Sequence, residues 1–172
     1  IGVGDPRGRH RQAAAGDQYL RAGSTSVSSE SRMTRSNTYK FDASFKTDIT
    51  ATDTELMQLQ SRTLYVGEKG EEIADYSENY TVKKNAALTA YIASVAKSST
   101  IFFYDDQLPA TSTTQYLRAD NANVSSDCAM TRSDTYKFDA SFVTTVTTAT
   151  EKVKLQSRTL YVGEKGEEIA DY

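Results

Sequence analysis

The stretch LQSRTLYVGEKGEEIADY occupies residues 59–76, and the same letters return without a single change at residues 155–172. A repeat of this kind has to be recognised first, because the repeated unit, and not the whole chain, then defines the architecture. No catalytic motif in the chain is as specific as this internal copy.

The match extends upstream in two shorter blocks. QYLRA begins at residue 18 and again at residue 115, while MTRSNTYKFDASF begins at residue 33 and returns at residue 130 as MTRSDTYKFDASF. These blocks predict an extended arm (1–16), a first repeat unit (17–76), a helical insert with its connector (77–114) and a second repeat unit (115–172). Recent duplication explains the identity; the alternative is that both copies meet the same surface on a symmetric partner.

Local patterns predict a mainly α fold with long irregular segments, in which the two repeat units are pseudo-symmetric and a helical insert joins them. The insert carries the clearest helical pattern, because apolar residues recur at spacings of three and four over 78–97 and alanines fill the turns. Further helices are expected at 53–66 and 150–162, at 68–76, and as short helical starts around 18–21 and 115–118.

Only one segment of each unit has the alternation of a strand. Aromatic residues and alanine alternate with polar residues over 39–45 and again over 136–142. A half-buried strand or extended segment is therefore expected in each unit. If these segments pair into a sheet, the fold is α+β, which is the alternative to the mainly α prediction.

The composition argues for a chain that orders best against a partner. Leu, Ile, Val and Phe make up 31 of 172 residues, whereas Ser and Thr make up 40 and the formal net charge is only −3. The mild acidity argues against nucleic-acid binding, which requires a basic face. No apolar run is long enough to cross a membrane, so no membrane insertion is expected.

Catalysis is not expected. The single histidine, His10, lies in a Gly- and Arg-rich arm, and no sequence pattern resembles a hydrolytic triad or a phosphate-binding loop. Two N-glycosylation sequons, at Asn79 and Asn123, would have meaning if the protein were secreted.

Cys128 is the only cysteine, so the chain can form neither an internal disulfide nor a cysteine-based metal cluster. One interpretation is a small buried hydrophobe. The other is covalent attachment of a conjugated ligand, for which Asp127 would bind pyrrole N–H groups, Arg132 would hold acidic side arms and Tyr136 would stiffen the ring system.

The duplicated blocks, together with the lone cysteine in SSDCAMTRS, resemble the gamma subunits of red-algal phycoerythrin and related phycobilisome rod linkers. The resemblance implies a chloroplast protein on the stromal side of the thylakoid, threaded through hexamers of phycoerythrin alpha and beta subunits. It also implies a bilin, phycoerythrobilin or phycourobilin, joined to Cys128 by a thioether.

The expected function is therefore that of a non-enzymatic linker that organises phycobiliprotein hexamers in a light-harvesting antenna. The alternative is an extracellular or surface tandem-repeat binding protein, which the two sequons and the Ser/Thr content favour.

Overall fold

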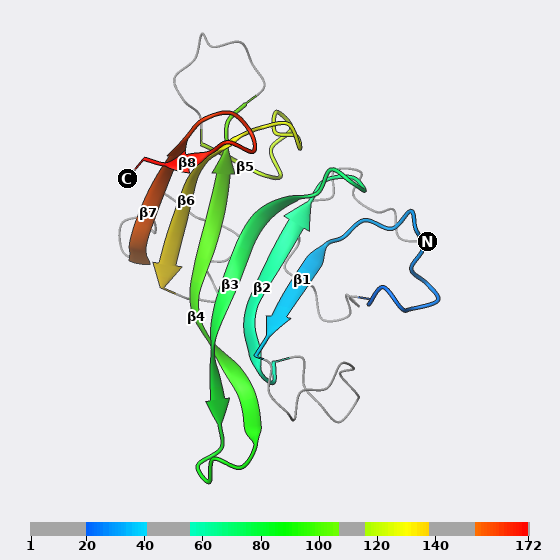
Figure 1. The fold of residues 1–172 in the computed structure, drawn as a ribbon, viewed down its shortest axis with the longest axis vertical. Coiled ribbons are helices and arrows are strands. Elements are labelled where there is room, and N and C mark those ends of the chain that lie inside the picture. Colours follow the sequence, from blue (N-terminus) through cyan, green and yellow to red (C-terminus); the bar gives the residue numbers. More distant parts are fainter. Residues whose placement is uncertain (1–19, 41–55, 107–115, 138–153, 172) are drawn as a thin grey trace.

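A computed structural model describes residues 20–40, 56–106, 116–137 and 154–171 as strands of one antiparallel sheet with their connecting turns (Figure 1). The strands follow the order β1-β2-β3-β4-β6-β7-β8, and β5 pairs with the end of β4. Their bounds are Arg35–Tyr39 (β1), Leu59–Val66 (β2), Ile73–Lys84 (β3), Tyr91–Tyr104 (β4), Leu117–Arg118 (β5), Met130–Lys137 (β6), Leu155–Val162 (β7) and Ile169–Ala170 (β8).

The prediction of a mainly α fold is wrong, and so is the α+β alternative, because the described residues are mostly antiparallel strands with essentially no helix. The segment 59–66, placed in a helix by its spacing, is a strand of the sheet. The expected helix at 68–76 is a turn followed by the start of β3. In the second unit, 155–162 is likewise a strand.

The expected amphipathic helix over 78–97 is a hairpin. Its first part completes β3 and its last part begins β4, with a tight turn at 85–90 between them. Asn85 closes this turn, because its side-chain Oδ1 accepts the Thr89 N–H at 3.0 Å and its own N–H reaches the Ala90 carbonyl at 2.9 Å. Leu88 has a left-handed φ of 58°, which a helix does not contain.

The extended segments expected at 39–45 and 136–142 begin inside strands, since β1 ends at Tyr39 and β6 ends at Lys137. The rest of both segments lies outside the described residues. The short helical start expected at 115–118 includes β5, where Leu117 and Arg118 are in a strand instead.

The two repeat units form the same three-stranded meander with the same register. Arg35 pairs with Leu64 in the first unit, as Arg132 pairs with Leu160 in the second. Both ladders contain a bulge at the tyrosine four residues after this arginine, Tyr39 or Tyr136. The next pairing also repeats, because Val66 faces Ile73 as Val162 faces Ile169. The two longer repeated blocks therefore specify the same local pairing in both units.

The strand β4 joins the units into a single sheet. It pairs on one side with β3 of the first unit and on the other with β6, the first strand of the second unit. The larger buried apolar cluster lies at this joint and contains Leu64, Tyr76, Ile101, Phe103 and Tyr136. A second cluster, made of Val66, Tyr104, Ala119 and Cys128, lies towards one end of the sheet.

Candidate functional site

The repeated turns are the most closely matched exposed features of the molecule. We call residues 67–72 and 163–168, both GEKGEE, turn 1 and turn 2; they connect β2 to β3 and β7 to β8 at the same end of the sheet (Figure 1). Gly67 and Gly163 adopt φ of 117° and 121°, and a Cβ on either would lie 2.5 Å from a carbonyl oxygen of the same turn. Both positions therefore require glycine.

A glutamate fixes each turn against the strand that starts the unit. The Glu72 carboxylate accepts the backbone N–H groups of Gly70 and Met33, each at 2.9 Å. In turn 2, Glu168 accepts the N–H of Gly166 at 2.8 Å and that of Met130 at 3.2 Å. The two turns therefore share their hydrogen bonds as well as their letters.

These hydrogen bonds stabilise the ionised carboxylates. The backbone N–H of Met33 is the largest cause that lowers the pKa of Glu72, and the N–H of Glu72 itself adds to it. For Glu168 the order changes: its own backbone N–H is the largest cause of the lowered pKa, and the N–H of Met130 contributes less. Both glutamates, which we call the clasp glutamates, are therefore charged at neutral pH.

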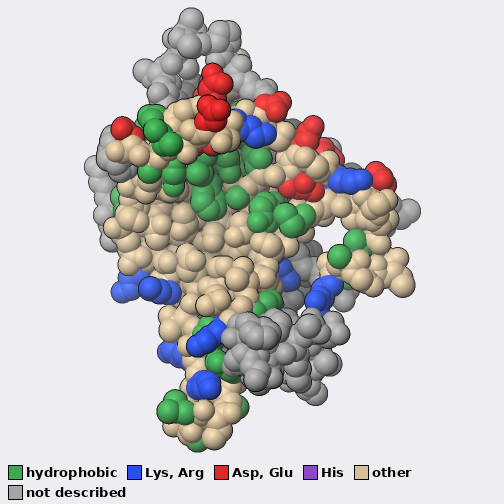
Figure 2. Space-filling view, viewed as in Figure 1, with side chains coloured by type: hydrophobic (Ala, Val, Ile, Leu, Met, Phe, Trp, Pro, Cys, Tyr) green, Lys and Arg blue, Asp and Glu red, His purple; other side chains and the backbone are tan. Residues whose placement is uncertain are grey.

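The remaining side chains of the turns point to solvent. Glu68, Lys69 and Glu71 are exposed in turn 1, and Glu164, Lys165 and Glu167 are exposed in turn 2. Acidic side chains gather at this end of the sheet in the space-filling view, with few basic ones among them (Figure 2). The end that carries both turns thus presents a mainly negative surface.

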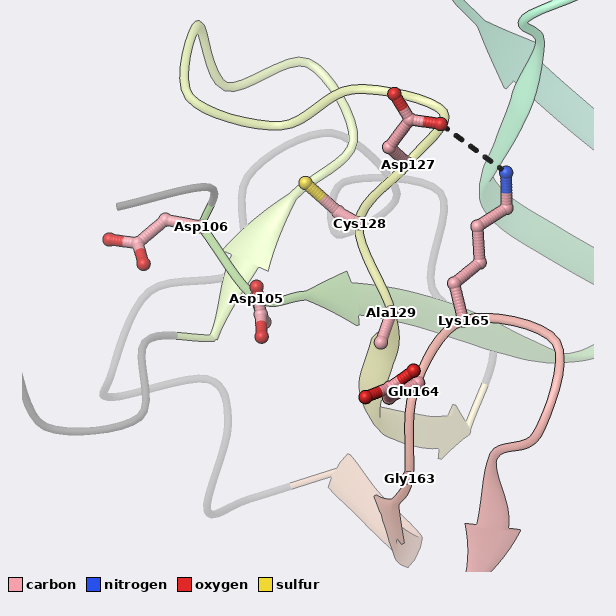
Figure 3. Close-up of a pocket in the computed structure, with 8 residues that line it drawn as sticks. All are labelled: Asp105, Asp106, Asp127, Cys128, Ala129, Gly163, Glu164 and Lys165. Atoms are coloured by element: carbon pink, nitrogen blue, oxygen red, sulfur yellow. Dashed lines mark ion pairs between the residues drawn. The ribbon is translucent and has the colours of Figure 1, made fainter. Parts of the chain in front are cut away.

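A hollow of about 420 Å³ lies beside turn 2 and contains part of the predicted ligand site (Figure 3). It is lined by Asp105, Asp106, Asp127, Cys128, Ala129, Gly163, Glu164 and Lys165. The Cys128 side chain is only 6% exposed, and its Sγ accepts the backbone N–H of Ser125 at 3.3 Å. Asp127 turns outwards to Lys165, with 4.0 Å between carboxylate and ammonium. A ligand with acidic side arms would meet four carboxylates and one ammonium here.

The structure does not bring all four predicted ligand residues together. Cys128 and Asp127 both line the hollow, whereas Arg132 and Tyr136 lie on β6 and are absent from its lining. The Arg132 guanidinium lies between two aromatic rings, 3.9 Å from the centre of Phe103 and 4.4 Å from that of Tyr116. Tyr136 is fully buried and donates its hydroxyl to Asp134 at 3.0 Å.

Asp134, a buried carboxylate on β6 with several ion-pair and hydrogen-bond contacts, is not among the site residues predicted from the sequence. Arg158 donates to it twice, at 2.7 and 2.8 Å, and the Nε of Arg132 lies 3.2 Å from it. A signal was present: Asn37 in the first unit becomes Asp134 in the second, within blocks that otherwise match letter for letter. At the first position a neutral amide accepts a single bond from Arg62 at 3.2 Å.

Unlike the ion pairs of Asp134, which lie within the second unit, another carboxylate–guanidinium pair connects the two units. Arg118 on β5 donates to Asp75 on β3 through both Nε and Nη2, at 2.9 and 2.7 Å, and the Asp75 side chain is nearly buried. Such a bidentate pair fixes direction as well as distance. The QYLRA block of the second unit is thereby held against the first unit.

The two sequons differ in accessibility. Asn79 lies within β3, is half-buried, and donates its side-chain amide to Ser98 at 3.4 Å. Asn123 lies in an exposed turn. Only Asn123 is therefore placed to carry a glycan.

In comparisons with known proteins, no family model, no curated protein and no solved structure matches the chain. In the ranges that the structure describes, no group of three or more His, Cys, Asp or Glu side chains is arranged to hold a metal ion. Within the same ranges, no helix has the length and apolarity needed to span a membrane.

Proposed function

We propose that the protein is a non-enzymatic scaffold that holds turn 1 and turn 2 at a fixed separation. Each turn then binds one of two equivalent, positively charged sites on the same partner. The observation that carries this proposal is the close match between the turns. They share six residues, two left-handed glycines and the glutamate clasp. Because a single hydrogen-bonded sheet connects them, their separation is set by strand pairing.

Packing accounts for only part of the sequence identity between the turns. The glycines and the clasp glutamate are needed to form each turn. The fold does not require the two other glutamates of each turn, which are exposed: Glu68 and Glu71 in turn 1, and Glu164 and Glu167 in turn 2. Surface positions of this kind usually tolerate substitution with little effect on stability. Their retention in both copies supports a shared contact surface, and their charge supports a basic partner.

Charge reversal of each turn tests the proposal. The first variant carries Glu68→Lys and Glu71→Lys, the second carries Glu164→Lys and Glu167→Lys, and the third carries all four changes. Partner proteins are captured from a native extract with the unmodified chain, purified, and titrated against each variant by calorimetry. Asp120→Lys, a change to an exposed acid outside both turns, is the matched control.

Two-point binding has a clear signature, because linking two contacts raises the apparent affinity by about 10²- to 10⁴-fold. We expect either double variant to lose about that factor and the fourfold variant to show no measurable binding. We expect the control to bind as the unmodified chain does. Equal affinity for all variants would refute the proposal, as would a stoichiometry in which each turn binds its own partner molecule.

A second candidate function is the light-harvesting linker that the sequence resemblance implies, with a bilin on Cys128 and phycoerythrin hexamers as partner. The observation that favours it is the position of Cys128 and Asp127 at one hollow. The test is to denature the native protein and look for visible absorption that stays with the polypeptide. Retained colour that Cys128→Ser abolishes supports this function, and a colourless chain refutes it.

A further inference from the structure

We propose that the end of the β3–β4 hairpin binds the surface of a membrane that carries anionic lipids. We call residues 80–96 the hairpin tip; they extend beyond the other strands, at the end of the sheet opposite turn 1 and turn 2 (Figure 1). Because the tip is a projection and not a groove, it fits a partner that can form around it. The tip lies apart from both turns, so binding here does not rest on the proposed function.

The hairpin is basic and contains no acidic side chain. No Asp or Glu occurs between Glu78 and Asp105, whereas this stretch contains Lys83, Lys84 and Lys97. All three lysines are exposed. Figure 2 shows Lys and Arg side chains towards this end of the molecule and Asp and Glu side chains at the end with the turns. The hairpin is therefore complementary in charge to a negative surface.

Apolar side chains lie exposed beside these lysines. Leu88 in the turn is 73% exposed, and Ile92 and Val95, on the strand that leaves the turn, are 44% and 48% exposed. Ile92 lies directly opposite Lys83 in the strand pairing. A lipid surface has the matching layers, because anionic headgroups cover an apolar interior and lysine side chains can reach the headgroups while their neighbours are buried.

The order of these side chains along the hairpin suits such layers. Lys84 is the last residue of β3, and the turn at 85–90 with Leu88 follows it directly. Leu88 therefore lies outermost and can enter the boundary between headgroups and acyl chains, about 5–10 Å deep. A strand rises about 3.3 Å per residue, so Lys83 and Lys84 then lie at the level of the phosphate groups.

The acidic end of the sheet does not oppose this contact, although the formal net charge of the chain is −3. β3 runs from Ile73, directly after turn 1, to Lys84, so the two ends are about 36 Å apart at the usual rise of a strand. Exposed charges are screened over about 8–10 Å at physiological salt. A membrane at the hairpin tip therefore attracts the lysines without repelling the turns, which face away from it.

A second copy of the chain is the other candidate, because its acidic end is also a negative surface. The hollow beside turn 2 would provide carboxylates for the lysines of the hairpin, but Cys128 and Ala129 are the only apolar side chains in its lining. Leu88 would therefore gain little apolar contact there. A lipid surface provides both an anionic layer and an apolar layer, and it is favoured for that reason.

Co-sedimentation with vesicles tests the lysines. The full chain is mixed with vesicles of phosphatidylcholine alone, or of phosphatidylcholine and phosphatidylserine in equal amounts, and we expect binding to the mixed vesicles only. A variant with Lys83→Gln and Lys84→Gln should bind about 25-fold more weakly, since each lysine near an anionic surface contributes about fivefold. The matched control, Lys69→Gln with Lys165→Gln, makes the same change of net charge in the turns and should bind as the unmodified chain does.

A leucine variant tests the apolar contact. Leu88→Asp should weaken binding to the mixed vesicles by about tenfold or more, because the side chain that enters the lipid is lost. Aspartate tolerates the left-handed φ of 58° at this position, so the turn should still form. Leu20→Asp, at a leucine that is 45% exposed outside the hairpin, should bind as the unmodified chain does.

Three results would overturn the proposal. The first is the absence of binding to the mixed vesicles, and the second is an equal loss of binding in the two lysine variants, which would show attraction without a defined site. The third is self-association of the chain in sedimentation without vesicles that Lys83→Gln with Lys84→Gln abolishes, because a second copy would then occupy the hairpin tip. In the unmodified chain, mixed vesicles should slow hydrogen exchange of the amides at 85–92 and leave those of the two turns unchanged. The reverse pattern would refute the proposal even if a variant fails to fold.

Discussion

Replacement of Asp134 by asparagine tests how much the stability of the sheet depends on this buried carboxylate, which links β6 to β7. Asp134 is fully buried, accepts two hydrogen bonds from Arg158 and one from Tyr136, and forms an ion pair with Arg132. The amide of asparagine keeps one acceptor oxygen and can still bond the tyrosine. What is lost is the negative charge and one of the two bonds from Arg158.

The magnitude follows from these contacts. A hydrogen bond to a charged group contributes about 1.5–3 kcal/mol, and breaking a buried ion pair costs about 3–5 kcal/mol. The side chain of Arg158 is 37% exposed, so water replaces part of what it loses and its share must be discounted. We expect Asp134→Asn to lower the free energy of unfolding by about 2–3 kcal/mol, which corresponds to about 4–12 °C in Tm.

The first unit provides the matched control. Asn37→Asp introduces the same carboxylate beside Arg62, but on a strand that is only half-buried. A pair in that setting contributes about 0–1 kcal/mol, so the change should be small and stabilising. Urea unfolding followed by far-UV circular dichroism measures both variants. A loss below about 0.5 kcal/mol for Asp134→Asn, or equal losses for the two changes, would refute the reasoning.

Three further predictions concern the turns and the sequons. Gly67→Ala should cost about 2 kcal/mol or more by urea unfolding, since its Cβ would meet a carbonyl at 2.5 Å, whereas Gly70→Ala should cost about 1 kcal/mol because its Cβ meets nothing within 4 Å. The pKa of Glu168 is lowered in the folded state, so its hydrogen bonds should stabilise turn 2 fully above pH 4.5 and lose their effect as pH falls through that lowered pKa. The protection factors of the turn 2 amides against hydrogen exchange should show this pH dependence, and Glu168→Gln should abolish it. In a secretory host, mass spectrometry should find glycan on Asn123 and none on Asn79; the reverse pattern would contradict the accessibility argument.

The helix prediction over 78–97 failed for a physical reason. Apolar residues at spacings of three and four fit a helix. The same segment, however, contains Asn85, whose backbone closes a hairpin turn, and Leu88, which has a positive φ in that turn. Long antiparallel pairing of β3 with β4 then outweighs the helix propensity of the alanines. Propensity is a weak preference that tertiary pairing overrides, and nothing local in the sequence reveals the partner strand.

The predicted ligand site was limited by the same lack of tertiary information. Cys128 and Asp127 are adjacent in sequence and remain together at the hollow. Arg132 and Tyr136 are only a few residues away. They lie in β6, which pairs with β4 on one side and β7 on the other, and both side chains are buried. Sequence distance therefore placed them near Cys128, while strand pairing determined what they contact.

By itself the sequence determined that the chain is built twice from one unit, and the two longer repeated blocks specify the same turns, bulges and registers in both copies. Only the tertiary structure decided that these units are sheets and not helices, since each strand is stable through hydrogen bonds to a neighbour distant in sequence. It also decided that four of the five matched residues are buried in β6, whereas the same four positions are only half-buried in β1. The physical cause is the presence of β4 beside one strand and not the other.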